Sequence, residues 1–150
     1  MALETRILHA GDQALLANVA PGVFDDAVDP ELVAEFLGDS RHHLAVAADQ
    51  GQVVGFASGV SYVHPDKPPE LWINEVGVAP SHQGQGVGKA VVRALLQHGE
   101  RLGCGQAWVL TDAANTAAMR LYASVGGTAD PVPSMVFTFR LAPPPRSAAE

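Results

Sequence analysis

Three glycines spaced two residues apart lead into an expected helix in the stretch SHQGQGVGKAVVRALL, residues 81–96: Gly84, Gly86 and Gly88. Glycine is the weakest ordinary helix former and costs about 1 kcal/mol at each helical position, so another property must account for these three. The first turn of a helix has free backbone N–H groups and a partial positive charge, and glycine lets a ligand approach that backbone closely. The stretch therefore predicts an anion site, most often for a phosphate, with an ordinary flexible turn and cap as the alternative.

Two common phosphate-binding patterns do not fit this stretch. The nucleoside-triphosphate loop GxxxxGK[ST] needs a glycine where Gln83 stands and a hydroxyl where Ala90 stands. The dinucleotide pattern GxGxxG needs a glycine at Lys89 or at Val91, and no suitable acidic residue follows at the expected distance. Kinase, GTPase and Rossmann interpretations are therefore disfavoured.

A glutamate lies in the strand-like stretch LWINEVGV, residues 71–78. Regular alternation along a strand predicts that Glu75 shares a sheet face with Leu71 and Ile73. A carboxylate on an apolar face is either paired or functional. Glu75 is therefore a candidate functional residue, with an edge or ion-paired glutamate as the alternative.

The histidines and the cysteine do not predict a metal site. Of the six histidines, His42 and His43 are adjacent and point to opposite sides of a strand, and the others show no pairing three or four residues apart. The single cysteine, Cys104, excludes an internal disulfide and is better explained as a small buried residue than as a nucleophile.

Composition limits the class of protein. The chain has 150 residues, 47% of them hydrophobic, and a formal net charge of −7, which argues against nucleic acid or an anionic membrane surface as partners. No stretch resembles a secretory leader or a membrane span, so we expect a cytoplasmic protein. Carboxylates are in excess between Asp25 and Glu75, which would suit a cationic substrate.

The hydrophobic pattern predicts a mixed sheet with helices on its faces. Asp29 is a good N-cap, Pro30 fits the first helical position, and Gly77 is a candidate β-bulge. The expected strands cover residues 3–9, 43–48, 52–63, 71–80, 107–111 and 134–141, and the expected helices cover residues 12–19, 30–38, 87–102 and 116–125. We expect one domain over residues 1–141 and a flexible C-terminal tail over residues 142–150.

The stretch that does fit the glycines is Gln83-x-x-Gly86-x-Gly88, behind a strand and ahead of a long helix. It resembles the acetyl-CoA-binding motif of the GNAT superfamily of N-acetyltransferases. A second GNAT-like stretch, NTAAMRLYASVGG, begins at Asn115 after the next expected strand, and departs from the family at Gly127, where an aromatic residue is usual. The resemblance covers roughly residues 3–141 and implies an α/β (α+β) fold. Its sheet would be mixed, mostly antiparallel and six- to seven-stranded, with helices on both faces.

The resemblance also implies roles for individual residues. Glu75 would take the proton of the attacking amine, Val78 N–H would face the thioester oxygen, and Tyr122 would donate a proton to the CoA sulfur. The alternative for Tyr122 is a core aromatic residue, and the alternative for Lys89 is a solvated helix residue. The residues implied in acetyl-CoA binding are Val76, Gly77, Val78, Gln83, Gly84, Gln85, Gly86, Val87, Gly88, Lys89, Asn115, Ala118 and Tyr122.

A looser likeness concerns the amine that accepts the acetyl group. The run from VFDDA through YVHPDKPPELWINEVGV resembles the aminoglycoside 3-N-acetyltransferases of this superfamily. It implies an acidic rim around a small-molecule amine, formed by Asp25, Asp26, Asp66, Glu70 and Glu75. The acceptor would then be an aminoglycoside or a similar polycation, attacked directly in a ternary complex. A protein or peptide amine in an open groove, and a non-catalytic acyl-CoA-binding module, remain alternatives. The apolar stretch 134–141 offers an edge for a homodimer.

Overall fold

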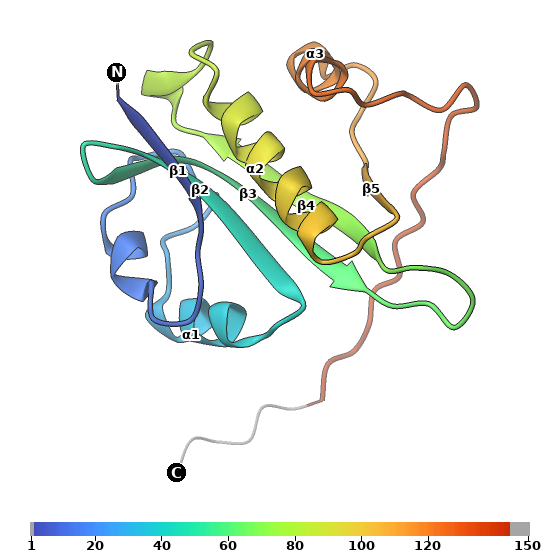
Figure 1. Cartoon of the computed structure of the whole chain (residues 1–150), viewed down its shortest axis with the longest axis horizontal. Helices are drawn as coiled ribbons and strands as arrows, with labels where there is room; N and C mark the ends of the chain where they lie inside the picture. Colours follow the sequence, from blue (N-terminus) through green and yellow to red (C-terminus); the bar gives the residue numbers. More distant parts are fainter. Residues whose placement is uncertain (1, 145–150) are drawn as a thin grey trace.

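The sheet of this protein has five strands in the order β1-β2-β3-β4-β5. A computed structural model describes residues 2–144 (Figure 1). The strands are β1 Leu3–Ile7, β2 His42–Asp49, β3 Gln52–Tyr62, β4 Glu70–Val78 and β5 Gln106–Val109. The helices are the short 3₁₀ turns η1 Gln13–Ala17 and η2 Pro80–His82, with α1 Pro30–Gly38, α2 Val87–Arg101 and α3 Thr116–Ser124. The first four strands pair antiparallel and β5 pairs parallel to β4, so the expected mixed, mostly antiparallel fold is confirmed.

Helix α2 lies across one face of the sheet, as Figure 1 shows. Glycines on β3 permit this close approach, because a Cβ on Gly59 would lie 2.9 Å from Trp72 O and 3.3 Å from a Leu95 methyl. Val87 and Leu95 are consequently buried against the central strands. The opposite face is covered by η1, by the loop between η1 and α1, and by α1. Phe24 of this loop stacks on Phe56 of β3 with ring centroids 4.2 Å apart.

Polar contacts also join α2 to the sheet. His43 of β2 is buried and has its Nε2 2.8 Å from Ser61 Oγ and its Nδ1 3.0 Å from His98 Nε2 of α2. Burial, followed by the neighbouring His98, lowers the pKa of His43 to about 4. Within residues 2–144, no group of three or more His, Cys, Asp or Glu side chains is placed to hold a metal ion.

Local signals placed several elements correctly. The Asp29 carboxylate accepts a hydrogen bond from Glu31 N (2.8 Å) and starts α1 with Pro30 in its first turn. The hairpin between β2 and β3 turns at Gln50 and Gly51, both with positive φ. The helix expected over residues 12–19 is only the 3₁₀ turn η1, because Val19 already pairs with Val53 in an isolated bridge.

The bulge in β4 lies at Asn74, not at Gly77 as expected. Ser58 and Gly59 are consecutive on β3, yet they pair with Glu75 and Ile73, so Asn74 is the extra residue. The bulge reverses the alternation beyond it. Glu75 therefore lies on the face opposite Ile73, and the expectation that both share a face is wrong.

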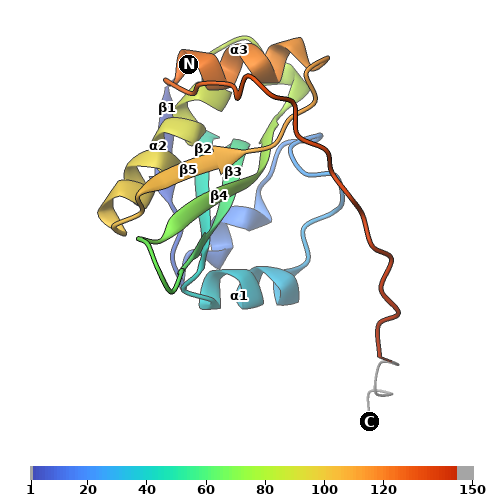
Figure 2. The same cartoon turned by 90° about the vertical axis from the view of Figure 1, so that its right-hand side faces the viewer.

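The strand expected over residues 134–141 is not formed. Figure 2 shows the chain after α3 running away from the sheet, and within the described residues the sheet has five strands rather than six or seven. Large apolar side chains of this stretch are exposed. Of the expected tail, residues 145–150 lie outside the described residues. No helix in residues 2–144 has the length and apolar character that a membrane crossing needs.

Candidate functional site

The glycine loop before α2 presents bare backbone. Gly84 and Gly86 have φ of 73° and 81°, a region that favours glycine, and a Cβ on either would meet nothing within 4 Å. Gly86 is the N-cap residue of α2, and no side chain caps that end of the helix. Exposed amides at the start of a 15-residue helix fit a diphosphate such as that of acetyl-CoA.

The other predicted loop residues contribute differently. The Gln83 amide approaches Val78 O at 3.5 Å, and the Gln85 amide donates to Ser81 O at 3.3 Å, so both side chains fold back on the loop. The Val87 side chain is buried in the core, which leaves its backbone for a ligand. Lys89 is partly exposed in the first turn of α2 and is the only cationic side chain of that turn.

Gly88 is one of the three glycines expected to let a ligand approach the backbone, and in the structure it also has a packing role. Its conformation is helical, and a Cβ there would lie 3.3 Å from Cδ2 of Leu121 on α3. The missing side chain therefore lets α3 pack closely on α2. Gly88 therefore also helps to place the helix that carries Tyr122.

The glycine loop is anchored by two side-chain hydrogen bonds that the sequence did not predict. His82 Nε2 lies 2.8 Å from Asp49 Oδ2, and Ser81 Oγ lies 2.8 Å from His82 Nδ1. Asp49 ends β2, so this contact ties η2 to the distant β2–β3 hairpin. No spacing in the sequence connects residues 33 positions apart, so local patterns could not have predicted the contact.

Strands β4 and β5 separate in the middle of β4. Their pairing runs from Glu70 with Gln106 to Ile73 with Val109, and beyond that point β4 has no partner on this side within residues 2–144. Ala79 N donates to Val54 O at 2.8 Å, toward β3. Because successive N–H groups point to opposite edges of a strand, Val78 and Val76 direct theirs to the open edge. This is where the expected roles of Val76, Gly77 and Val78 require free backbone groups.

Helix α3 carries the two other predicted cofactor residues and the tyrosine. Asn115 is its N-cap, and its Oδ1 accepts a hydrogen bond from Ala118 N at 3.1 Å, so this oxygen serves the helix. Tyr122 is half-buried and packs against the core. Burial raises the pKa of the Tyr122 phenol, which keeps the hydroxyl protonated at neutral pH and able to donate a proton.

A cavity of about 390 Å³ opens beside Glu75 on the face away from α2. It lies among β3, β4, α1 and the loop before α1, with aromatic side chains on its walls. Its carboxylate residues are Asp25, Asp26, Asp29 and Glu75, and its lining includes no Lys, Arg or His. Three of these four were predicted as substrate-binding residues, and Asp29 was predicted only as a helix cap. Such a cavity attracts cations and repels anions.

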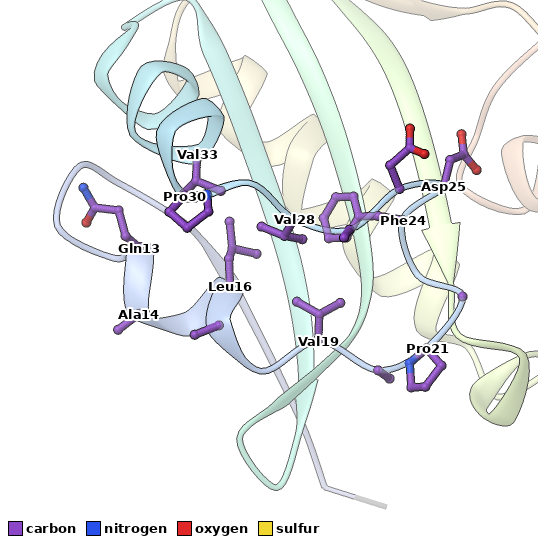
Figure 3. Close-up of a pocket in the computed structure, with 15 residues that line it drawn as sticks. Gln13, Ala14, Leu16, Val19, Pro21, Phe24, Asp25, Val28, Pro30 and Val33 are labelled. Atoms are coloured by element: carbon purple, nitrogen blue, oxygen red, sulfur yellow. The ribbon is translucent and has the colours of Figure 1, made fainter.

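A second hollow, of about 650 Å³, lies on the other side of the same loop, between η1 and α1 (Figure 3). Figure 3 shows Leu16 and Val28 facing this space, with Asp25 at the end nearer β4. Asp25 and Asp26 border both cavities, but Glu75 borders only the first. The 390 Å³ cavity is therefore the one that meets the open edge of β4.

Asp66 and Glu70 do not belong to this acidic cavity. Glu70 begins β4, five residues before Glu75 and roughly 17 Å away along the strand. Its carboxylate is 6% exposed, accepts a hydrogen bond from Gln106 (2.7 Å) and contacts His64 (2.8 Å) and Lys67 (3.3 Å). The Gln106 hydrogen bond, with the nearby Lys67 and His64, lowers the pKa of Glu70. The expectation that these two acids help form the rim is wrong, because the proline-containing loop lies at the closed end of β4.

Comparisons with known proteins identify the family of the chain. The family model described as "Acetyltransferase (GNAT) family" matches residues 14–126, so the chain belongs to this family, whose acyl donor is acetyl-CoA. An N-alpha-acetyltransferase from Mycobacterium tuberculosis is 36% identical over 69% of this chain and 63% of its own length. A streptothricin acetyltransferase from Streptomyces lavendulae is 35% identical over 59% of this chain and 44% of its own length. The match thus spans less than two thirds of either relative.

The fold is also that of a solved aminoglycoside acetyltransferase from an uncultured soil metagenomic sample, crystallised with sisomicin. The TM-score is 0.77 with 19% sequence identity, over 92% of this chain and 97% of that one. At this level of identity the similarity establishes the shared fold. The acceptor of the present protein must be argued from its own cavity.

Proposed function

We propose that the protein is an acetyl-CoA-dependent N-acetyltransferase acting on a primary amine of a polycationic small molecule, with an aminoglycoside (3-N type) as the first candidate. The observation that carries this proposal is the cavity with four carboxylate residues and no basic side chain, which meets the open edge of β4 at Glu75. Its volume lies within the usual range for small-molecule sites. The proposal includes a homodimer as the working state. A cytoplasmic location remains a prediction.

The residues of this chain fit acetyl-CoA, which supplies the activated acyl thioester when bound. Amides of the loop 83–89 would bind the diphosphate, and Val76 and Val78 would present N–H groups to the arm in the gap between β4 and β5. Gly77 faces the opposite side, where a Cβ would meet Phe56 and the Val23 carbonyl, so it lets the loop before α1 pack on β4. Acetyl-CoA would therefore approach at the open edge of this strand segment, and the amine at the face that Glu75 and Gly77 share.

The chemistry follows from what this arrangement can do with protons and charge. Glu75, directly or through a water molecule, accepts the proton that the amine loses as its nitrogen bonds to the acetyl carbon. Val78 N–H donates to the acetyl oxygen as that oxygen gains negative charge, which is worth a few kcal/mol in comparable sites. Tyr122 would donate its hydroxyl proton to the sulfur that leaves when the C–S bond of a bound thioester breaks. These roles apply the family resemblance to residues of β4 and α3.

A second candidate acceptor is a protein or peptide amine, favoured by the identity to the N-alpha-acetyltransferase. It would need a groove that admits an extended chain, whereas the loop before α1 folds over β4 at Gly77. A third candidate, a non-catalytic acyl-CoA-binding module, predicts that Glu75→Gln and Tyr122→Phe change no measurable rate. The acidic, cation-free lining favours the polycationic small molecule over both.

A CoA-release assay over a panel of acceptors tests the proposal. The panel contains aminoglycosides with and without a 3-amino group, streptothricin, polyamines and peptides with free N-termini. Turnover should be highest with the polycations, and loss of the 3-amino group should abolish it if the 3-N position is the acceptor. Turnover with peptides alone would overturn the small-molecule assignment. Raised antibiotic resistance of a bacterial host that expresses the protein would link the activity to that role.

Charge-neutralising variants tie the assay to the cavity. Asp25→Asn/Asp26→Asn should raise KM for a polycation at least about 10-fold, because two nearby charges are lost, and should leave KM for a monoamine nearly unchanged. Asp66→Asn is the control for loss of a carboxylate outside the cavity, and it removes one charge where the double variant removes two. Equal effects of the two changes would contradict the assignment of the cavity.

A further inference from the structure

A buried serine on β3 lines the acidic cavity. Ser58 lies in the middle of this strand, and only 7% of its surface is exposed. Within residues 2–144, the hydroxyls of Ser61, Ser81 and Ser124 make hydrogen bonds, whereas the Ser58 hydroxyl makes none. Ser58 is therefore a polar side chain that is more than nine tenths buried and has no partner in the described part of the chain.

The alternation of β3 directs the Ser58 side chain into the cavity. A Cβ on the next residue, Gly59, would lie 3.3 Å from a methyl of Leu95 on α2, so Ser58 points to the opposite face of the sheet. Phe56, two residues earlier on β3, lines the same cavity as Ser58. Burial of a hydroxyl costs free energy unless the group is hydrogen-bonded, so this position indicates a partner that enters the cavity.

The neighbours of Ser58 across the sheet differ on its two sides. On β2 the opposite residue is Leu44, which is apolar and buried. On β4 the opposite residue is Glu75, and the bulge places Asn74 beside it against the same serine. Cβ atoms of directly opposed residues in antiparallel strands lie about 5 Å apart. The Ser58 hydroxyl and the Glu75 carboxylate therefore border one small part of the cavity.

An amine nitrogen fits between these two groups. A neutral primary amine has two N–H donors and one lone pair, and a hydroxyl oxygen and a carboxylate oxygen both accept hydrogen bonds. Side chains that extend from Cβ atoms about 5 Å apart can contact one nitrogen from two sides. With one N–H donated to each oxygen, the nitrogen is held in place and its lone pair stays free to attack.

We propose that Ser58 is an amine-binding residue, whose Oγ accepts one N–H of the acceptor amine while Glu75 accepts the other. Glu75 takes its proton as the nitrogen bonds to the acetyl carbon, and the N–H on Ser58 is retained as the N–H of the amide product. A secondary amine has only one N–H and cannot serve both oxygens, so this site selects primary amines. The inference rests on the proposed function, because it concerns the amine of that reaction.

Two substitutions at Ser58 test the contact, with the acceptor that gives the highest turnover in the panel. Ser58→Ala removes the oxygen and should lower kcat/KM for the amine about 3- to 30-fold, the range for one hydrogen bond, while KM for acetyl-CoA changes less than about twofold. Ser58→Thr keeps the hydroxyl and should recover most of the loss. Ser61→Ala is the matched control on the same strand, since the Ser61 hydroxyl contacts His43 instead of the cavity. Its kcat/KM should stay near that of the wild type.

A double-mutant cycle distinguishes amine binding from support of the fold. In a Glu75→Ala background the nitrogen has lost its other contact, so Ser58→Ala should cost less than one third of the factor that it costs in the wild type. A serine that only supports the strand would cause the same loss in both backgrounds. The N-methyl derivative of the acceptor at its reacting nitrogen gives a second readout. The wild type should prefer the primary amine, and Ser58→Ala should reduce that preference.

The outcomes separate this inference from the proposed function. A loss in Ser58→Ala that is coupled to Glu75 and recovered in Ser58→Thr supports it, and the coupling alone decides if Ser58→Thr does not fold. An unchanged kcat/KM in Ser58→Ala, or an equal loss in both backgrounds, overturns the role of Ser58 and leaves the acetyltransferase proposal intact. A wild-type protein that acetylates no amine overturns the proposed function, and this inference with it.

Discussion

Strand β4 carries a glutamate near each end, and the two have opposite surroundings. Glu70 is buried, and its carboxylate contacts Gln106, His64 and Lys67 in the region where β5 still pairs with β4. Glu75 is exposed in the acidic cavity, past the bulge at Asn74 and past the last β5 pair. The comparison teaches that pairing with β5 determines which carboxylate is structural and which is available for chemistry.

Two irregularities meet in the middle of β4. Its separation from β5 leaves the backbone edge at Val76 and Val78 without a strand partner within residues 2–144, and its bulge against β3 turns Glu75 toward the cavity. A strand with regular pairing throughout would have put Glu75 on the face against α2. The proposed donor and acceptor sites therefore depend on these two adjacent irregularities.

Glu75→Gln should have the largest effect. Loss of the base is expected to lower kcat by about 10²- to 10³-fold with the best acceptor, because a positioned general base typically contributes that much. KM for acetyl-CoA and the melting temperature should change little, since the side chain is exposed. Steady-state kinetics and thermal unfolding of the same preparation measure both. Equal losses of rate in Glu75→Gln and Glu70→Gln would show that the two ends of β4 do not differ as described.

Tyr122→Phe tests whether the site beside the Glu75 end of β4 includes a residue of α3. We expect kcat to fall about 10- to 100-fold, with both KM values nearly unchanged, because only the transferable proton is removed. The wild-type rate should also fall at high pH, with a midpoint above the usual tyrosine pKa because burial raises the pKa of Tyr122. This alkaline decrease should be absent in the variant. Its persistence there would assign the titration to another group.

Asp49→Ala tests the anchor of the glycine loop. Loss of the hydrogen bond to His82 should raise KM for acetyl-CoA about 3- to 10-fold, the range expected for one side-chain hydrogen bond, with kcat unchanged. Asp49→Asn, which keeps an acceptor oxygen, should restore most of the affinity. Asp39→Ala is the control, since Asp39 bonds Arg41 away from the loop. A larger effect on the acceptor KM than on that of acetyl-CoA would contradict an anchoring role.

Glu70→Gln should have the smallest effect on rate, with kcat within about twofold of wild type. Its effect should appear in stability against pH. The folded-state pKa of Glu70 lies below its unfolded value near 4.5, so its stabilising contribution is present above that pH and is lost as the pH falls through the folded pKa. Melting temperatures measured from pH 6 to pH 3 should therefore decrease less steeply in the variant. An identical slope would mean that the cluster around Glu70 adds no stability.

Local sequence signals were enough to predict much of the fold. The cap at Asp29 and the positive-φ turn at Gln50 and Gly51 depend on neighbouring residues, and so does the uncapped start of α2 at Gly86. The motif resemblance also implied that the Val78 N–H would be available to a ligand. These features depend on a few consecutive residues, which a single sequence contains in full.

The features that the sequence predicted wrongly or did not predict depend on residues that are distant in the sequence. The bulge at Asn74 is defined by the register against β3, and Glu70 is separated from the cavity by the length of β4. The contact between Asp49 and His82 joins elements 33 residues apart. The alternation of residues 134–141 indicated a strand, but alternation contains no information about a partner, and this strand is not formed. Local periodicity cannot supply such pairings, because they are settled by tertiary packing.

Both tryptophans of the chain, Trp72 and Trp108, stack across β4 and β5 with ring centroids 5.8 Å apart, one pair before the strands part. Tryptophan fluorescence of this protein therefore comes from the place where β4 and β5 separate. A ligand that separates the strands next to this pair is therefore expected to change the emission, which a fluorescence titration would measure. Intrinsic tryptophan fluorescence can thus report a change in the separation of β4 and β5 when a ligand binds.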